Sequence, residues 1–463
     1  MIALLELPVA VLNSVKHIHF IGIGGIGMSA LALLLKKQGK TVSGSDQIDS
    51  QLLHTLRAAD IQVHIGHAAK HTESADLVVY SSAVKPENPE RIYAEAHHIP
   101  EIRRAELLGQ IAAGYENTLA VAGTHGKTTT TGMCGMILIA AAMDPSILVG
   151  GILPNLKSNL RLGEHGHIVV EADEYDRSFL ALNPSQIIVT TLEADHLDIY
   201  KDLQDVRDTF LQFISKLDKD GILVLQGDDE ELKQLALRSP NPVTTYGLSH
   251  GTDYQAIDIQ LTNFVSNFKV VKNGTPLGDI TLNMPGNHNV MNALGACALT
   301  HMMGISFADI KAGLESFHGV ERRFQLKGSL KGIQFIDDYA HHPSELEATL
   351  RAARSAWPGS RIIAVFQPHL YSRTRDFAGE FATALELADL PILTDIYPAR
   401  ELPIPGVSSD LIINESNGSV RLIPNIEAVH AYLVPLLRSG DLLITMGAGD
   451  IWKLHELFLE AGE

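Results

Sequence analysis

The sequence predicts an α/β protein with three domains, from its length, its alternating strand and helix patterns, and two glycine-rich loops that each join a strand to a helix. The chain has 463 residues, which corresponds to roughly two to four domains. Three segments each open on a short apolar strand pattern and continue with helical and strand patterns in alternation. This is typical of parallel sheets covered by helices. We expect the domains to span residues 1–116, 117–322 and 323–463.

The composition excludes several classes of protein. Hydrophobic residues make up 45% and charged residues 19%, an ordinary globular balance. The net charge of -18 argues against a nucleic-acid partner, because no basic excess exists to neutralise phosphates. Two cysteines, Cys134 and Cys297, exclude a disulfide scaffold and fit a reduced interior. No targeting or membrane-spanning segment stands out, so we expect a cytoplasmic protein without a membrane partner.

The first segment begins with a βαβ pattern. A strand over 17–22 is followed by a helix over 28–37 and a second strand over 41–44. The loop between the first strand and the helix reads Gly-Ile-Gly-Gly-Ile-Gly over 22–27, where glycines allow backbone amides to approach a diphosphate. Asp46 follows where a ribose-binding acid is expected. This motif favours NAD when taken alone, and it leaves NAD and a nucleotide-sugar as open alternatives.

The second segment carries a phosphate loop. The strand pattern Thr118–Ala122 precedes Gly-Thr-His-Gly-Lys-Thr-Thr over 123–129, and an apolar helix follows. Backbone amides of such a loop hold phosphates, Lys127 supplies a positive charge, and the Thr128 hydroxyl can bind Mg²⁺. The loop is shorter than the usual one, with Val121 in place of the first glycine. Further strands are predicted over 168–170, 186–190 and 221–225, and hairpins over 254–279 with Asn-Gly at 273–274.

Two acidic clusters follow strands of the second segment. Glu171, Asp173 and Glu174 come directly after the strand 168–170, and a second acidic run that includes His196 lies at 193–198. The carboxyl ends of parallel strands are where α/β sheets collect ligands. Hard oxygen ligands suit Mg²⁺, so the two clusters predict a magnesium site beside the phosphate loop.

The third segment predicts strands over 333–336, 361–366, 390–393 and 441–445. Polar motifs lie before and between these strands. Asn289 and Asn292 lie where a helix opens and can read adenine, and the alternative is that Asn287 or Asn289 caps the helix. The pair His341 and His342 has no cysteine or third histidine at zinc spacing, so zinc is not favoured. Arg323 lies at the expected domain boundary.

These motifs, in this order from Gly22 to Asp450, resemble the Mur ligases. The motifs that carry the resemblance are the phosphate loop and the segments Gly22–Ser29, Gly319–Gln325, Asp338–Pro343, Phe366–His369, Asp395–Glu401, Gly406–Ser409 and Met446–Asp450. The resemblance implies a Rossmann-like UDP-sugar domain, a P-loop ATPase-like central domain, and a Rossmann-like C-terminal domain that brings the amino acid.

The resemblance also implies the reaction. ATP would activate the carboxylate of UDP-N-acetylmuramate as an acyl phosphate, and L-alanine would attack it, releasing phosphate beside ADP. This is a step of peptidoglycan precursor synthesis, and hence of cell-wall growth and division. The implied partners are ATP, one or two Mg²⁺ ions with Mn²⁺ as an alternative, UDP-N-acetylmuramate and L-alanine, with the protein a monomer or homodimer.

The resemblance assigns roles residue by residue. The catalytic residues would be Lys127, Arg323 and His342. ATP would be bound by Gly123, Thr124, His125, Gly126, Lys127, Thr128, Thr129, Asn289, Asn292, Arg323 and Asp338. The UDP-sugar would be bound by Gly22, Gly24, Gly25, Ile26, Gly27, Ser45, Asp46, Ser81 and Ser82. The amino acid or muramate would contact His341, His369, Arg373 and Arg400. The metal ligands would be Thr128, Glu171, Glu174 and His196, with Glu171 favoured over Glu174.

The sequence differs from the family pattern at two positions, and three other hypotheses for its function stay open. Thr191 stands where many relatives have asparagine, and Leu370 where many have arginine, which puts one substrate contact in doubt. The rivals are a sister ligase that adds a whole tripeptide to the same sugar, an NAD-dependent oxidoreductase, and a non-catalytic nucleotide-binding module. The oxidoreductase reading leaves the phosphate loop and both acidic clusters unexplained.

Overall fold

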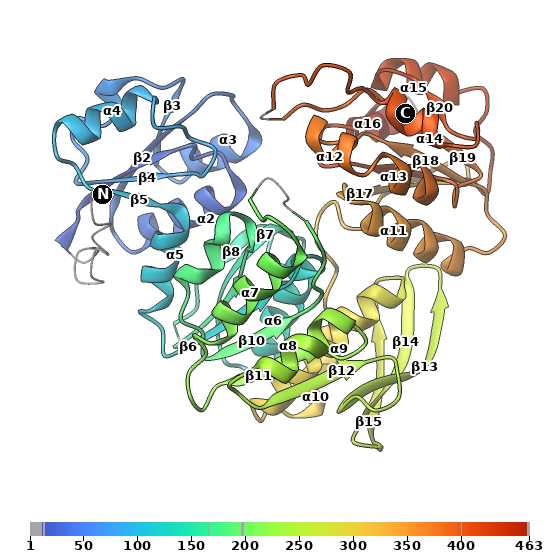
Figure 1. Cartoon of the computed structure of the whole chain (residues 1–463), viewed down its shortest axis with the longest axis horizontal. Coiled ribbons are helices and arrows are strands. Elements are labelled where there is room, and N and C mark those ends of the chain that lie inside the picture. Colours follow the sequence, from blue (N-terminus) through green and yellow to red (C-terminus); the bar gives the residue numbers. More distant parts are fainter. Residues whose placement is uncertain (1–11, 13, 165, 196–198, 400, 461–463) are drawn as a thin grey trace. The chain divides into compact units, whose positions relative to one another are not determined.

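The computed structural model describes residues 12, 14–164, 166–195, 199–399 and 401–460 (Figure 1). The chain divides into two compact units. The first contains Met1–Ile257, Lys269–Ile280 and Met291–Phe317, and the second contains Asp258–Phe268, Thr281–Val290 and His318–Glu463. His196 and Arg400 lie outside the described residues.

The N-terminal sheet has the order β3-β2-β1-β4-β5, and all of its strands are parallel. Its strands are β1 (His17–Ile21), β2 (Thr41–Asp46), β3 (Gln62–Ile65), β4 (Leu77–Tyr80) and β5 (Glu101–Arg103). Its helices are α2 (Ile26–Lys37), α3 (Gln51–Ala58), α4 (Pro89–Ala96) and α5 (Arg104–Ala112), with a short 3-10 turn η1 (Ala69–His71). The register pairs Ile21 with both Ser45 and Tyr80, so β1, β2 and β4 end at the same edge of the sheet.

The central sheet has the order β15-β14-β13-β12-β11-β10-β6-β9-β7-β8. Its strands are β6 (Asn117–Ala122), β7 (Ser146–Leu153), β8 (Ser158–Arg161), β9 (His167–Glu171), β10 (Gln186–Val189), β11 (Ile222–Gln226), β12 (Val243–Gly247), β13 (Tyr254–Thr262), β14 (Val265–Lys272) and β15 (Thr275–Leu282). Its helices are α6 (Lys127–Ala140), α7 (Leu203–Ile214), α8 (Glu230–Arg238), α9 (Asn287–Met302) and α10 (Phe307–Glu315), with the 3-10 segment η2 (Tyr175–Ala181). Strand β6 lies between β10 and β9 and is parallel to both. The phosphate loop follows β6 and the first acidic cluster lies at the end of β9, so the two lie at the ends of adjacent strands.

The C-terminal sheet has the order β16-β17-β21-β18-β19-β20. Its strands are β16 (Gln325–Leu330), β17 (Ile333–Asp338), β18 (Ile362–Phe366), β19 (Leu390–Leu393), β20 (Arg421–Leu422) and β21 (Leu442–Met446). Its helices are α11 (Pro343–Ala356), α12 (Tyr371–Asp376), α13 (Ala378–Leu385), α14 (Asp410–Glu415), α15 (Ile426–Leu433) and α16 (Lys453–Glu460). Only the edge strand β16 runs antiparallel to its neighbour.

The predicted α/β class and the predicted strands are confirmed. The first βαβ pattern appears as β1, α2 and β2, and the Asn-Gly turn at 273–274 joins β14 to β15. Buried aliphatic residues explain why the strands form, since Ile18 and Phe20 of β1 and Leu34 of α2 are fully enclosed in one core. Among the described residues, no helix is long and apolar enough to cross a membrane.

Candidate active site

The glycine loop of the N-terminal domain is closed by hydrogen bonds to β2. The Gly22 and Ile23 amides donate to the carbonyl of Ser45 at 2.8 and 3.0 Å, and the Gly24 amide donates to Asp46 Oδ2 at 2.8 Å. The Gly25 amide donates to the Gly22 carbonyl at 3.2 Å. The donors left for an anion are therefore the first amides of α2, at Ile26, Gly27 and Met28, which have no partner one turn back. The loop, Ser45 and Asp46 are thus brought together as expected.

The other expected UDP-sugar residues follow β4. A Cβ built on Gly22 would lie 3.3 Å from Cβ of Ser81, so Ser81 borders the loop, and Gly22 itself has a φ of +81°. Ser82 is exposed. Sequence reasoning missed Arg104, whose Nη1 would lie 3.1 Å from a Cβ on Gly27. This places a guanidinium beside the N-terminus of α2, where both favour an anion. The signal was weak, because Arg104 meets the loop only through the packing of α5.

The phosphate loop needs glycine at two positions. A Cβ on Gly123 would lie 2.1 Å from Thr190 Oγ1, and one on Gly126 would lie 2.4 Å from Asn292 Oδ1, and both glycines have positive φ. The segment after β10 supports the loop, since the Thr124 amide donates to the Thr191 carbonyl at 3.0 Å and the His125 amide to Thr191 Oγ1 at 2.9 Å. Thr191, one of the two departures, therefore has a role in fixing the loop.

Lys127 begins α6 and is enclosed by oxygen atoms. Its Nζ lies 2.9 and 2.6 Å from the two carboxylate oxygens of Glu174, and 2.6 and 3.1 Å from the carbonyls of Gly123 and Thr124. Burial alone would lower the pKa of Lys127, but the carboxylates of Glu174, Asp173 and Glu171 raise it above its usual value. Lys127 therefore keeps its positive charge, and an incoming phosphate would compete with Glu174 for it.

Thr128 and Glu171 form a pair of oxygen ligands next to this lysine. The Thr128 hydroxyl donates to Glu171 Oε1 at 3.1 Å, while the Gly150 amide fixes Glu171 Oε2 at 2.9 Å. Two oxygens at this spacing, on a strand end and a helix start, suit a hard cation such as Mg²⁺. Glu174 instead contacts Lys127, so Glu171 stays the predicted metal ligand of the two. His196 lies outside the described residues.

Asn289 and Asn292 lie three residues apart on α9. Asn292 Oδ1 lies next to Gly126, whereas the Asn289 amide group donates to the Pro285 carbonyl at 2.7 Å and is buried. The Asn289 side chain is therefore bonded to the segment just before its own helix, and its contact with adenine stays a prediction. Thr129 is buried on the helix that carries Lys127.

In the second unit, Asp338 ends β17 and is held by backbone amides. Phe324 and Ala340 each donate to its carboxylate at 2.8 Å. Burial raises the pKa of Asp338 to about 6, against the lowering effect of the Arg323 charge. The Arg323 guanidinium instead contacts Glu345 Oε1 at 3.3 Å and lies over the Tyr339 ring.

Glu345 is a second residue that sequence reasoning missed. Its carboxylate accepts the His341 and His342 amides at 3.0 and 3.3 Å as well as Arg323, so three expected site residues converge on it. The available signal was the capping-box spacing, since His342 caps α11 and Glu345 is its third residue. Burial lowers the pKa of His341 to about 4, so its ring is neutral near pH 7.

His369 and Arg373 follow β18. The His369 ring stacks on Tyr397 and lies edge-on to His341, with ring centres 6.0 and 5.9 Å apart. Arg373 is buried. Leu370 has a φ of +72°, which costs energy for a branched side chain, and it is buried. Leu370 therefore contributes to packing, and it offers no charged contact to a substrate. Arg400 lies outside the described residues.

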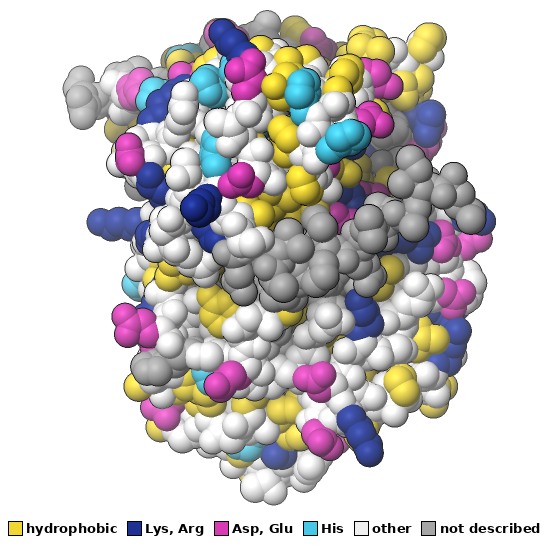
Figure 2. All heavy atoms as spheres, turned by 90° about the vertical axis from the view of Figure 1, so that its left-hand side faces the viewer, with side chains coloured by type: hydrophobic (Ala, Val, Ile, Leu, Met, Phe, Trp, Pro, Cys, Tyr) yellow, Lys and Arg dark blue, Asp and Glu magenta, His cyan; other side chains and the backbone are white. Residues whose placement is uncertain are grey.

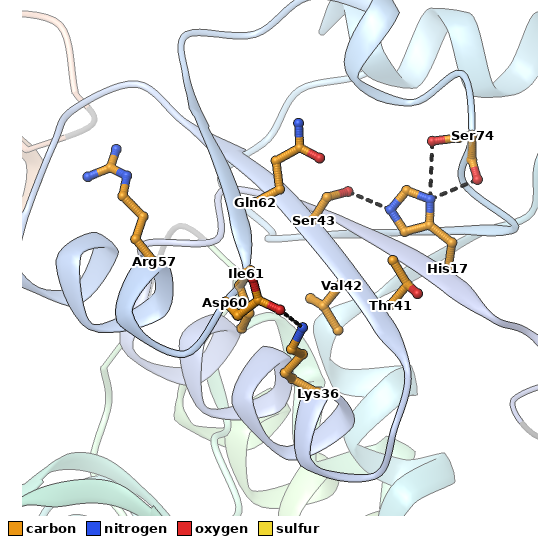
Figure 3. Close-up of a pocket in the computed structure, with 10 residues that line it drawn as sticks. All are labelled: His17, Lys36, Thr41, Val42, Ser43, Arg57, Asp60, Ile61, Gln62 and Ser74. Carbon is orange, nitrogen blue, oxygen red and sulfur yellow. Dashed lines mark hydrogen bonds and ion pairs between the residues drawn. The ribbon is translucent and has the colours of Figure 1, made fainter.

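An open pocket lies in the N-terminal domain, away from the glycine loop. The pocket lies at the opposite edge of the N-terminal sheet, where β1, β2 and β3 begin, and it is lined by Lys36, Arg57, Asp60 and His17 among others (Figure 3). Lys36 is paired there with Asp60 at 2.8 Å. Figure 2 shows positive and negative side chains interspersed on the face it displays.

Three family models together match nearly the whole chain. They are described as Mur ligase family, catalytic domain (17–116), Mur ligase middle domain (121–300), and Mur ligase, glutamate ligase domain (322–449). A protein of Geotalea uraniireducens is 44% identical over 97% of this chain and 98% of its own length. One of Salinibacter ruber is 42% identical over 97% and 95%.

Solved structures agree with this. A crystal structure from Thermotoga maritima matches with a TM-score of 0.83 and 30% identity, covering 96% of this chain and 99% of that one. A murein peptide ligase from Psychrobacter arcticus matches with a TM-score of 0.73 and 27% identity over 96% and 98%. The chain therefore belongs to the Mur ligase family, and the predicted family, three-domain fold and class of enzyme are confirmed. Both relatives carry the name UDP-N-acetylmuramate–L-alanine ligase, and the Thermotoga protein carries the name UDP-N-acetylmuramate-alanine ligase.

Proposed function

We propose that the chain joins L-alanine to the carboxylate of UDP-N-acetylmuramate, using ATP and forming ADP and phosphate. The observation that carries this proposal is the 44% identity with a protein of that name over 97% of the chain. The site chemistry supports it, because a charged lysine, a Thr–Glu oxygen pair and a helix N-terminus meet where two parallel strands end.

The activation step follows from the residues of the first unit. A carboxylate and a γ-phosphate repel each other, so their approach needs positive charge and oriented amides. Lys127 would leave Glu174 for the phosphate, and the α6 amides would add their dipoles. Thr128 and Glu171 would hold Mg²⁺, which when bound neutralises phosphate charge.

The second step needs a free amine. L-Alanine arrives as an ammonium, which must lose a proton before it attacks the acyl phosphate. We propose that the second unit supplies this function through its histidines. His341 is neutral at pH 7, because burial lowers its pKa to about 4. The same burial makes the ring a weak base, so it would accept the proton only where the negative charge of the bound substrates stabilises its protonated form. His342 caps α11 and is bound through Nδ1 to Ser344 at 2.8 Å, which supports a positioning role for it.

We also propose that the enzyme acts in the cytoplasm, where ATP and UDP-sugars are found. Its product would enter peptidoglycan synthesis and so support cell division. We predict that the protein is a monomer or a homodimer. Light scattering of the purified protein would measure its molecular mass and so decide between the two.

The test is an assay of phosphate release. Pure protein is incubated with ATP, Mg²⁺ and UDP-N-acetylmuramate, and the acceptor is varied among L-alanine, glycine, L-serine and the stem tripeptide. We expect release with L-alanine at the lowest concentration. Release with the tripeptide and not with L-alanine would support the sister ligase, and oxidation of NADH with no phosphate release would support the oxidoreductase.

A further inference from the structure

A buried carboxylate lies beneath the proposed UDP-sugar site, and no step above uses it. Glu90, in the first turn of α4, is fully buried. One of its oxygens accepts the Ser45 hydroxyl at 2.5 Å. The other contacts His71 Nδ1 at 2.7 Å and accepts the Ala68 amide at 3.2 Å. A carboxylate removed from water is tolerated only when it is paired in this way, so its position is strongly specified.

Ser45 connects Glu90 to the glycine loop. Its hydroxyl is held by Glu90, and its carbonyl accepts the Gly22 and Ile23 amides. The next residue, Asp46, accepts the Gly24 amide through its side chain and the Gly66 amide through its carbonyl at 2.8 Å. One residue of β2 thus transmits the position of Glu90 to the turn that precedes α2.

The polar contacts continue across the sheet on one face. Glu90 lies 3.5 Å from His19 Nε2, and His19 Nδ1 contacts Ser43 Oγ at 2.8 Å. Ser43 Oγ also contacts His17 Nε2 at 2.8 Å, and His17 and Ser43 line the pocket of Figure 3. Strands of a parallel sheet are normally apolar on both faces. Here every second residue is polar, His17 and His19 on β1 and Ser43 and Ser45 on β2. Together with Glu90 they form a hydrogen-bonded polar network on one face of the sheet.

We propose that Glu90 is a positioning residue for the UDP-sugar: by holding Ser45 and the segment around His71, it fixes the glycine loop in the shape that receives the diphosphate. This inference rests on the proposed function. Glu90 itself is buried beneath Ser45 and acts through it. Its removal is expected to affect the UDP-sugar far more than ATP, whose phosphate loop follows β6.

The test compares Glu90→Gln with Glu95→Gln, an exposed glutamate on the same helix. Glutamine keeps the size of Glu90 but places a donor against one of its donors. We expect the KM for UDP-N-acetylmuramate to rise about tenfold or more, as for the loss of a hydrogen bond to a charged group. The KM for ATP should stay within about twofold. The Glu95→Gln variant should match the wild type. An unchanged KM for the UDP-sugar, or equal shifts for all substrates, would overturn the proposal.

A second variant keeps the proposal testable if Glu90→Gln does not fold. Ser45→Ala removes the same link while leaving the carboxylate in place, and it should raise the same KM. The double variant should be no worse than the weaker-binding single variant, because both changes break one connection. Additive losses would show that Glu90 does not act through Ser45.

Hydrogen exchange of the ligand-free protein separates this inference from the proposed function. If the wild type shows no turnover of UDP-N-acetylmuramate, the proposed function fails, but the support of the loop can still be measured. The Gly22, Ile23 and Gly24 amides should exchange faster in Glu90→Gln than in Glu95→Gln. Equal exchange rates would overturn the positioning role whatever the substrate.

Discussion

At the scale of single residues, Lys127 carries the sharpest prediction. Lys127→Ala should lower ligase turnover by about a thousandfold or more, because a cation at the transferring phosphate is lost. The structure adds a cost in stability, since Glu174 would remain buried without its cation, a loss of about 3–5 kcal/mol for a broken buried pair. Thermal melting and initial rates measure the two effects.

The matched control is the double variant Lys127→Ala with Glu174→Gln. Neutralising the carboxylate should recover most of the stability, because no unpaired buried charge remains. It should recover no activity. Near-wild-type turnover in either variant would contradict the role of Lys127 as a phosphate ligand.

Glu90 makes a pH-dependent contribution to stability. Burial would raise the pKa of Glu90, but its contacts with His19, Ser45 and His71 together lower it from 4.5 to about 2. Because the folded-state pKa lies below the unfolded value, the stabilisation is fully present above pH 4.5 and is lost as the pH falls towards 2. We expect the difference in free energy of unfolding between wild type and Glu90→Gln to shrink across that range. A pH-independent difference in denaturant titrations would contradict this.

At the scale of helices and strands, the glycine loop gives a prediction about α2. The amides of Gly22, Ile23 and Gly24 already donate within the protein, so UDP-N-acetylmuramate should chiefly protect the first amides of α2, Ile26 to Met28, from hydrogen exchange. Exchange measured residue by residue, with and without the UDP-sugar, checks this. Protection by NADH and not by the UDP-sugar would favour the oxidoreductase reading.

The elements themselves were predictable to different degrees. Strands β1, β6 and β10 follow from apolar runs, and the β14–β15 hairpin follows from Asn-Gly, because these signals are local. The edge strands β8, β16 and β20 have no such signal, being short or half-exposed. The neighbours of the phosphate loop were predictable because parallel strands end at one edge of a sheet.

Glu90, Arg104 and Glu345 were not predictable as site residues, for a common physical reason. Each is an ordinary charged residue near the start of a helix, and at least one partner of each lies on another part of the chain that only the tertiary fold brings close. For the same reason, the sequence alone did not decide between Glu171 and Glu174 as the metal ligand. Glu171 ends β9 and Glu174 follows it, and only their contacts with Thr128 and Lys127 distinguish their predicted roles.

At the scale of the whole molecule, the proposed residues of one reaction are divided between the two units. The phosphate loop and Glu171 belong to the first, whereas Arg323, Asp338 and His341 belong to the second. An acyl phosphate made at the first unit must be reached by an amine that the second unit activates, and it must be protected from water. We therefore predict that the two units come together around the substrates during catalysis.

Arg323 provides the test of this closure. We expect Arg323→Ala to lower turnover far more than it weakens ADP binding, because ADP lacks the γ-phosphate that the guanidinium would contact. Small-angle scattering should show the wild type becoming more compact with UDP-N-acetylmuramate and a non-hydrolysable ATP analogue, and the variant much less so. Arg351→Ala, which removes an exposed arginine paired along α11, is the matched control and should behave as the wild type. Equal compaction of wild type and Arg323→Ala would exclude a role in closure, since the γ-phosphate contact would then be dispensable for bringing the units together.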